Sequence, residues 1–190
     1  RAKTDEREQF WGRLTQECDR LENLISEILA LARLDADPGA AQPVDLERLL
    51  DDLQADARLS APGQRLAIQH SAQAAFKGWP DMLARALDNL LRNAMRFNPP
   101  EQPIVLCIEH QPALLLISVR DHGPGVPEEL LDKLGEPFFR APGQAAAGHG
   151  LGLAIARRAA ERHGGRLLLA NHPQGGFIAT LELPLAGTAP

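Results

Sequence analysis

The feature that most constrains the fold is a strict heptad repeat near the start of the 190-residue chain. Between Phe10 and Leu34, apolar residues recur at alternating spacings of four and three. The repeat consists of Leu14, Cys18, Leu21, Ile25, Ile28 and Ala32, with Leu24 and Leu31 beside it. A helix with such a seam buries it against another helix. We therefore predict a long bundle-forming helix; the alternative is a surface helix packed on its own domain.

A proline- and glycine-rich stretch follows this helix and predicts a boundary between two modules. The stretch DADPGAAQP holds two prolines and a glycine, and residues of this kind interrupt regular structure. We predict a helical module over residues 1–37, a linker over 38–44 and a second module over 45–190.

Beyond the linker, the apolar pattern predicts helices and strands that do not alternate strictly. The predicted helices start after Asp45, run from Pro80 to about Phe97, and cover 127–134 and 151–163. The predicted strands are RLAIQH, AAFKGW, PIVLCIEH, ALLLISVR, RLLLANH and GFIATLELPL. A doubly wound sheet requires strict alternation, whereas this order favours an α+β two-layer sandwich with helices on one face of a mixed sheet.

Composition excludes several function classes. The 20 Lys and Arg against 25 Asp and Glu give a net charge of −5, which argues against nucleic acid as a partner. Cys18 and Cys107 have no spacing typical of a zinc site or a disulfide framework. No run approaches the roughly 18 apolar residues of a membrane span, and the first residues are too charged for a signal peptide.

Three alternate glycines run directly into a predicted helix in the segment GHGLG, residues 148–152. The segment lacks the lysine and hydroxyl of a Walker A loop, and it does not follow a strand as a dinucleotide fingerprint does. The backbone N–H groups of Gly148, Gly150 and Gly152 can still approach an anion closely, beside the positive end of the helix. Taken alone, this segment is equally an ordinary loop.

Two further stretches require the same ligand. DHGPG ends a predicted strand, so the carboxylate of Asp121 can accept a hydrogen bond from an exocyclic amine while the glycines leave room for a flat ring; alone, it is equally a turn. LDNLLRNAMRFN places Asn89 and Asn93 one turn apart on one helix face. Their carbonyl oxygens suit a Mg²⁺ ion that bridges to phosphates.

In this order, the stretches resemble the sequence boxes of the histidine-kinase ATP-binding domain, over roughly residues 45–185. DNLLRNAMRFN resembles the N box, DHGPG the G1 box, EPFFR the F box and GHGLGL the G2 box, and RHGG before a strand also recurs in that family. The resemblance implies the ATP-binding sandwich that these kinases share with the chaperone, gyrase and mismatch-repair ATPases.

The resemblance also implies ATP and Mg²⁺ as ligands and a role for each matching residue. Asn93, with Asn89, would hold Mg²⁺, and Arg96 would reach the phosphates. Phe97 would lie against the base, and Asp121 would bind the adenine amine. The other implied contacts are Gly123 and Gly125 at the base, Phe138 and Arg140 at a lid over 138–147, and Gly148, His149, Gly150, Leu151 and Gly152 around the triphosphate.

Residues 5–35 resemble the second helix of the helical hairpin that dimerises in such kinases. The first helix of that hairpin carries the phosphoacceptor histidine, and none of the six histidines of this chain has the acceptor motif. We expect the acceptor helix upstream of Arg1 and no autophosphorylation by this stretch. The resemblance further implies a homodimer, a response-regulator receiver domain as partner, and the cytoplasmic portion of a bacterial inner-membrane protein.

Some positions depart from the family pattern. His149 stands where Thr or Ser is usual, Phe97 where Tyr is common, and Gly135 where a bulky residue is usual. Asn89 stands where the related ATPases have a glutamate general base, and an amide cannot take a proton from water. Phosphoryl transfer is therefore favoured over hydrolysis. The alternatives are a nucleotide-binding regulatory module and an ATPase of the same fold.

Overall fold

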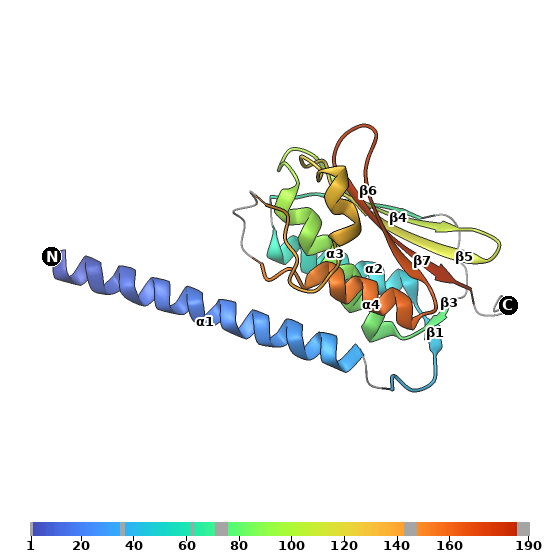
Figure 1. Cartoon of the computed structure of the whole chain (residues 1–190), viewed down its shortest axis with the longest axis horizontal. Helices are drawn as coiled ribbons and strands as arrows, with labels where there is room; N and C mark the ends of the chain where they lie inside the picture. Colours follow the sequence, from blue (N-terminus) through green and yellow to red (C-terminus); the bar gives the residue numbers. More distant parts are fainter. Residues whose placement is uncertain (1, 35–36, 62, 71–75, 143–147, 186–190) are drawn as a thin grey trace.

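The computed structural model describes residues 2–34, 37–61, 63–70, 76–142 and 148–185. One long helix, α1 (Ala2–Leu34), extends away from a body in which helices pack on a sheet (Figure 1). No helix in these ranges is long and apolar enough to cross a membrane.

The body is built on a five-stranded mixed sheet with the strand order β2-β4-β5-β7-β6. The strands are β2 (Leu66–His70), β4 (Ile104–His110), β5 (Leu114–Arg120), β6 (Arg166–Asn171) and β7 (Phe177–Pro184). β2 and β4 are parallel, and the other neighbours are antiparallel. β5 is the central strand, so Asp121, which follows its last residue, lies at the middle of one end of the sheet.

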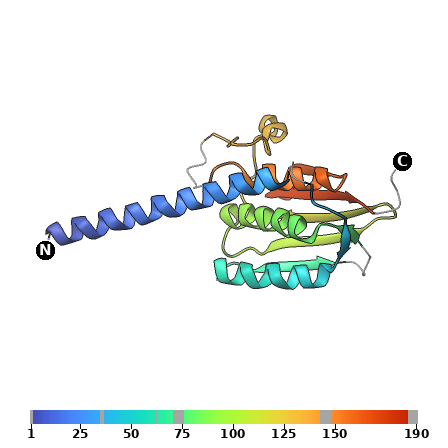
Figure 2. The same ribbon diagram turned by 90° about the horizontal axis from the view of Figure 1, so that it is seen from below.

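Three helices lie side by side on one face of this sheet (Figure 2). α3 (Pro80–Phe97) lies between α2 (Leu46–Ser60) and α4 (Gly152–Arg162). Leu83, Leu87 and Leu90 of α3 are fully buried. The predicted α+β sandwich is therefore confirmed, and the helix predicted over 127–134 is the 3₁₀ helix η1 (Glu128–Lys133).

Local signals account for the starts of the helices. The carboxylate of Asp45 accepts a hydrogen bond of 3.0 Å from the N–H of Arg48 and so caps α2. Pro80 is the first residue of α3, where its missing N–H leaves no donor unpaired. Leu151 precedes α4 as its N-cap, directly after two residues of the glycine segment with positive φ, Gly148 and Gly150.

The predicted linker contains a short strand. β1 (Gln42–Val44) pairs antiparallel with β3 (Phe76–Gly78), so residues 42–44 are not unstructured as the proline-rich composition predicts. The sequence gives no strand signal here because Pro43 lies within a strand of only three residues, which proline tolerates at an edge. Val44 lies opposite Phe76, and both are buried.

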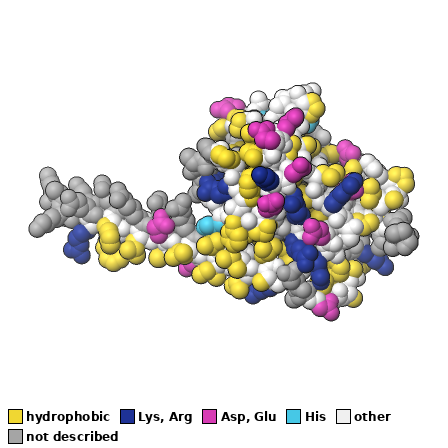
Figure 3. Space-filling model, viewed as in Figure 1, with side chains coloured by type: hydrophobic (Ala, Val, Ile, Leu, Met, Phe, Trp, Pro, Cys, Tyr) yellow, Lys and Arg dark blue, Asp and Glu magenta, His cyan; other side chains and the backbone are white. Residues whose placement is uncertain are grey.

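The predicted long helix is confirmed, and its heptad seam faces away from the body. Leu14, Leu21, Ile25 and Ile28 are exposed, and Figure 3 shows hydrophobic side chains running along α1 toward the body. Another face of α1 packs on α4 through the buried residues Ala30 and Leu34. Packing on the body therefore does not account for the seam, and its partner helix remains a prediction.

A half-buried histidine joins the two helices that carry the candidate site. His163, at the C-terminal end of α4, accepts a hydrogen bond at Nε2 from the N–H of Trp79, at 3.0 Å. Its Nδ1 therefore carries the proton and donates to the carbonyl of Ala159, at 2.8 Å. Burial lowers the pKa of His163, and the hydrogen bond to Ala159 opposes that shift. A Cβ at Gly78 would lie 2.7 Å from the imidazole, so this junction requires glycine.

This junction predicts a pH-dependent stability. Because the folded pKa of His163 lies below its ordinary value, the unfolded chain binds this proton more readily. The free energy of unfolding should therefore carry no penalty from His163 above the ordinary pKa of histidine. As the pH falls below that value, protonation of this side chain should lower the free energy of unfolding, by at most about 1.4 kcal/mol per pH unit. Urea unfolding of the chain and of His163→Phe between pH 8 and 5 checks this. A pH slope that is equal in both proteins would contradict it.

Candidate functional site

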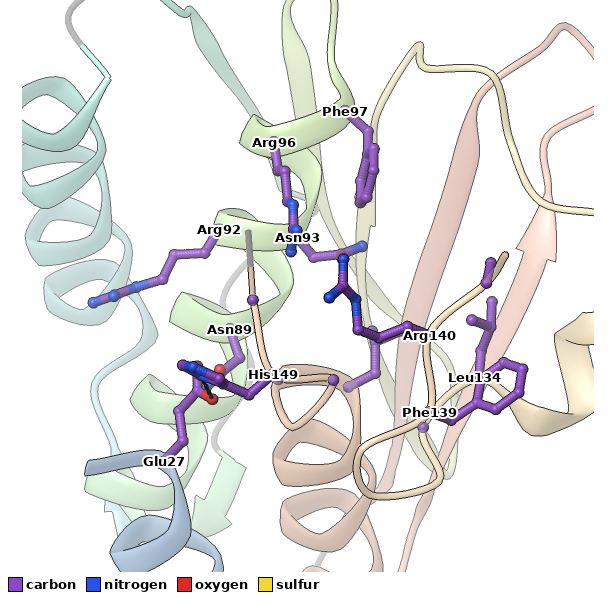
Figure 4. A pocket seen from close by; sticks show the side chains of 16 residues that line it. Glu27, Asn89, Arg92, Asn93, Arg96, Phe97, Leu134, Phe139, Arg140 and His149 are labelled. Atoms are coloured by element: carbon purple, nitrogen blue, oxygen red, sulfur yellow. Dashed lines mark hydrogen bonds and ion pairs between the residues drawn. The ribbon is translucent and has the colours of Figure 1, made fainter. Parts of the chain in front are cut away.

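A cavity of about 260 Å³ opens between the C-terminal half of α3, the segment 134–141 and the glycine segment. Figure 4 shows its side chains converging from these elements and from α1. Its described lining comprises Glu27, Asn89, Arg92, Asn93, Arg96, Phe97, Leu134, Gly135, Phe139, Arg140, Ala141, Gly148, His149, Gly150, Gly152 and Leu153. The lining is mixed: amides, guanidinium groups, one carboxylate and one imidazole lie beside leucine, phenylalanine and glycine residues.

The amides come from the face of α3 that does not pack on the sheet. Asn89 donates from Nδ2 to the carbonyl of Arg85, at 2.8 Å, which orients the side chain. Its Oδ1 faces the start of α4, because a Cβ at Gly152 would lie 3.1 Å from it. Asn93 lies one turn further along in the cavity wall. Two such carbonyl oxygens fit the oxygen ligands that Mg²⁺ takes beside phosphates.

The glycine segment lies tightly against its neighbours. Gly150 has a left-handed φ of 74°, and a Cβ there would lie 2.6 Å from the carbonyl oxygen of Phe139. The carbonyl of Gly150 accepts a hydrogen bond of 3.1 Å from Phe138. A Cβ at Gly148 would collide with the guanidinium of Arg96. Glycine is therefore required for this close approach, which brings the segment to the arginine and to α4.

Positive charge is concentrated where the glycine segment lines the cavity, because Arg92, Arg96 and Arg140 line the same cavity. The pKa of Arg96 is lowered by burial and by the nearby charge of Arg140, and Glu27 opposes the shift. Arg92 is paired with Asp88 at 2.9 Å. Two guanidinium groups that repel one another favour an anion between them, as a phosphate chain would provide.

A narrower cleft of about 40 Å³ adjoins the cavity and shares Asn93, Phe97, Leu134 and Leu153 with it. Asp121 lines this cleft and is only 2% exposed. Burial raises the pKa of Asp121, while hydrogen bonds from Gly123 and Phe177 oppose the shift. Both N–H groups donate to Oδ1, at 2.8 and 3.2 Å. Among the described residues, Oδ2 therefore remains available to a ligand, and the cleft must widen to admit a ring.

Two asparagines that the sequence does not single out hold the turn after Asp121. Asn98 accepts a hydrogen bond of 2.9 Å from the N–H of His122. Asn171, at the end of β6, binds Val126 twice: it accepts from the N–H at 2.8 Å and donates to the carbonyl at 2.7 Å. Both contacts join segments far apart in the chain, so no local pattern announces them. They fix the backbone that shapes the cleft.

Most of the predicted site residues lie together. Those in the larger cavity are Asn89, Asn93, Arg96, Phe97, Arg140, Gly148, His149, Gly150 and Gly152, and those in the cleft include Phe97, Asp121 and Gly125. This proximity is what a single ligand requires, although the role of each residue remains a prediction.

Three predicted contacts lie outside the lining of both spaces. Leu151 is fully buried in the core, and Phe138 is 60% exposed with a left-handed φ of 67°. A Cβ at Gly123 would lie 2.7 Å from the carbonyl oxygen of Phe97, so this glycine permits close packing behind the cleft. Residues 143–147 of the predicted lid lie outside the described residues. Glu27 of α1, which the sequence does not single out, does line the cavity.

Comparison with known proteins decides the family. Residues 78–187, more than half of the chain, match the histidine kinase-, DNA gyrase B-, and HSP90-like ATPases. The chain belongs to this family. The predicted resemblance and fold are thus confirmed. Among the relatives of this ATPase-family chain is sensor protein QseC of Escherichia coli, 35% identical over 169 residues that cover 86% of this chain and 37% of QseC.

A second relative is sensor histidine kinase GtrS of Pseudomonas aeruginosa, 33% identical over 186 residues that cover 96% of this chain and 37% of GtrS. The chain therefore spans less than half of these curated relatives. Full-length ShkA in complex with AMPPNP is a similar solved structure, with a TM-score of 0.77, 27% identity, and coverage of 92% of this chain and 38% of ShkA. The mycobacterial sensor histidine kinase MprB has a TM-score of 0.69, 26% identity, and coverage of 76% and 98%.

The two hydrogen bonds between Asn171 and Val126 predict how the turn beside the cleft of this ATPase-family member responds to mutation. Asn171→Ala leaves the N–H and carbonyl of Val126 without their partners, so we expect a loss of about 1–3 kcal/mol in the free energy of unfolding. The Val126 amide should also exchange its hydrogen faster, as followed by NMR. Gln174→Ala, on the exposed turn of the same hairpin, is the matched control. An unchanged rate of hydrogen exchange at the Val126 amide in Asn171→Ala would contradict this role of Asn171.

Proposed function

We propose that this chain is the ATP-binding catalytic part of a sensor histidine kinase. It would bind Mg–ATP and transfer the γ-phosphate to a histidine on a helical domain, for relay to a response regulator. The proposal is supported above all by one arrangement. A buried carboxylate lines the narrow cleft, amides and arginines line the larger cavity, and the two spaces adjoin at Asn93, Phe97, Leu134 and Leu153. An adenine base and a phosphate chain need these two surroundings.

At the base end, Asp121 would accept a hydrogen bond from the exocyclic amine of adenine at Oδ2. Gly123 and Phe177 hold Oδ1, so the carboxylate is oriented before the ligand arrives. Phe97 would lie against the ring. A guanine base presents a carbonyl at the place of that amine, so a carboxylate there favours adenine over guanine.

At the phosphate end, the carbonyl oxygens of Asn89 and Asn93 would hold Mg²⁺, which neutralises charge on the phosphates when bound. Arg96 and Arg140 would contact the phosphate oxygens, and the N–H groups of residues 148–152 would surround the chain of phosphates. In the transfer, an imidazole nitrogen would attack the γ-phosphorus, the bond to the bridging oxygen would break, and ADP would leave.

Transfer is favoured over hydrolysis because the amide of Asn89 cannot take a proton from water. Glu27 is the only carboxylate among the described residues that line the larger cavity, and its Oε2 lies 3.2 Å from Nδ1 of His149. The acceptor histidine would lie upstream on a helix that pairs with the exposed seam of α1. We further propose a homodimer through these helices and a place on the cytoplasmic side of a bacterial inner membrane.

The assignment of Asp121 predicts both the strength and the pH dependence of ATP binding. Asp121→Asn keeps an oxygen that can accept from the N–H groups of Gly123 and Phe177. It removes the negative charge and puts an NH₂ donor where Oδ2 faces the adenine amine, so the Kd for Mg–ATP should rise by at least about tenfold. In the unchanged chain, affinity should fall on acidification at a pH above the ordinary pKa of Asp, because burial raises the pKa of Asp121. Calorimetric titration between pH 8 and 5 measures both effects.

The control for this prediction is Asp132→Asn, which removes an exposed carboxylate of η1 and should leave the Kd unchanged. Asn93→Ala should weaken binding with Mg²⁺ far more than without it. Circular dichroism checks that each variant keeps the fold. Equal affinity for ATP in Asp121→Asn, Asn93→Ala and the unchanged chain would reject the site.

Phosphoryl transfer is tested by adding an acceptor in trans. We expect that, with Mg²⁺ and γ-³²P-labelled ATP, this chain labels a helical hairpin domain that carries the acceptor histidine, and does not label itself. Asn93→Ala should abolish the labelling. Tight nucleotide binding without label on the hairpin would favour a regulatory nucleotide-binding module, and rapid phosphate release without an acceptor would favour an ATPase.

A further inference from the structure

One side-chain contact joins α1 to the glycine segment. Nδ1 of His149 lies 3.2 Å from Oε2 of Glu27, and the two side chains are 24% and 30% exposed. Figure 4 shows this pair beside Asn89, at the end of the cavity where α1 passes. A serine or threonine at position 149 would be too short to make this contact in the same way. The imidazole of the glycine segment thus reaches the helix.

Glu27 brings a negative charge into a cavity that otherwise collects positive charge. It lines the same cavity as Arg96 and Arg140, and its charge stabilises the ionised form of Arg96 against burial and against Arg140. A bound polyphosphate would likewise stabilise the positive charges of Arg96 and Arg140. Two anions that compensate the same guanidinium groups at close range repel one another.

The position of Glu27 depends on how α1 packs. Ala30 and Leu34 follow Glu27 by three and seven residues, so all three lie on one face of the helix. Both apolar residues are buried where α1 packs on α4. α4 begins at Gly152, the last residue of the glycine segment. Movement of α1 away from α4 would therefore withdraw the carboxylate from the cavity and release His149.

We propose that Glu27 sets the affinity of the nucleotide site for phosphate chains, because its carboxylate occupies the anion-binding end of the cavity whenever α1 packs on α4. The proposal rests on the proposed function of the cavity. By linkage, a polyphosphate that binds against Glu27 weakens the packing of α1 by the same factor by which packed α1 weakens the polyphosphate. Occupancy of the site and position of the helix are thus coupled through one charge.

The test compares the unchanged chain with Glu27→Gln, which keeps the shape and a hydrogen bond to His149 but removes the charge. Glu22→Gln is the matched control, because Glu22 is exposed on the same helix. Calorimetry measures the Kd of AMP, of Mg–ATP, and of inorganic tripolyphosphate, which needs no base cleft. We expect Glu27→Gln to bind Mg–ATP and tripolyphosphate about 3- to 10-fold more tightly, with a much smaller change for AMP.

Each other outcome overturns the proposal. Unchanged or weaker binding of tripolyphosphate and ATP in Glu27→Gln contradicts it, as does an equal gain for AMP or the same gain in Glu22→Gln. Failure of the proposed function can be told apart from failure of this proposal. If ATP binds no more tightly than tripolyphosphate, the base cleft is wrongly assigned. The effect of Glu27→Gln on tripolyphosphate binding still decides the role of Glu27. Absence of any binding in both proteins contradicts both.

A second measurement follows the helix itself. Cys18 is exposed on α1, so a nitroxide or fluorophore attached there, in a Cys107→Ser background, reports the mobility of α1. We expect Mg–ATP to increase this mobility in the unchanged chain and AMP to leave it unaltered. In Glu27→Gln, the increase with Mg–ATP should be much smaller. An equal increase in both proteins would show that the charge of Glu27 does not couple the helix to the site.

Discussion

The packing of α3 against the sheet is the interaction on which the site depends. Leu83, Leu87 and Leu90 are fully buried, and burial of side chains of this size contributes about 1.5–3 kcal/mol each. These contacts fix the rotation of the helix about its axis. With that rotation fixed, Asn89 and Asn93 must lie away from the sheet and in the wall of the cavity. The hydrophobic core therefore orients the polar groups.

The remaining parts of the site are held by long-range polar contacts. Asp121 follows the central strand β5 and is fixed by the N–H of Phe177 at the start of β7. Asn98 and Asn171 tie the turn after Asp121 to the end of α3 and to β6. His163 joins the end of α4 to Trp79, just before α3. The two helices and the acidic turn are thus linked as one frame around the cavity.

Much of this arrangement can be predicted from the sequence, because helices and strands carry local signals. The cap at Asp45 and the start of α3 at Pro80 are where the sequence places them. The strand β1 is too short to carry a periodic pattern, and Asn171 and Glu27 contact the site across 45 and 122 residues. Leu151 matches a motif position but is buried as core, since a motif does not say which side chain of a segment faces the ligand.

We propose that one Mg²⁺-bound adenine nucleotide spans the cavity and the adjoining cleft. A crystal structure of the chain with Mg²⁺ and a non-hydrolysable ATP analogue tests it most directly. The predicted result has the adenine amine on Oδ2 of Asp121, the metal on the carbonyl oxygen of Asn93, and the phosphates along residues 148–152. A nucleotide that binds elsewhere, or whose base lies outside the cleft while Asp121 keeps its present surroundings, would contradict the claim.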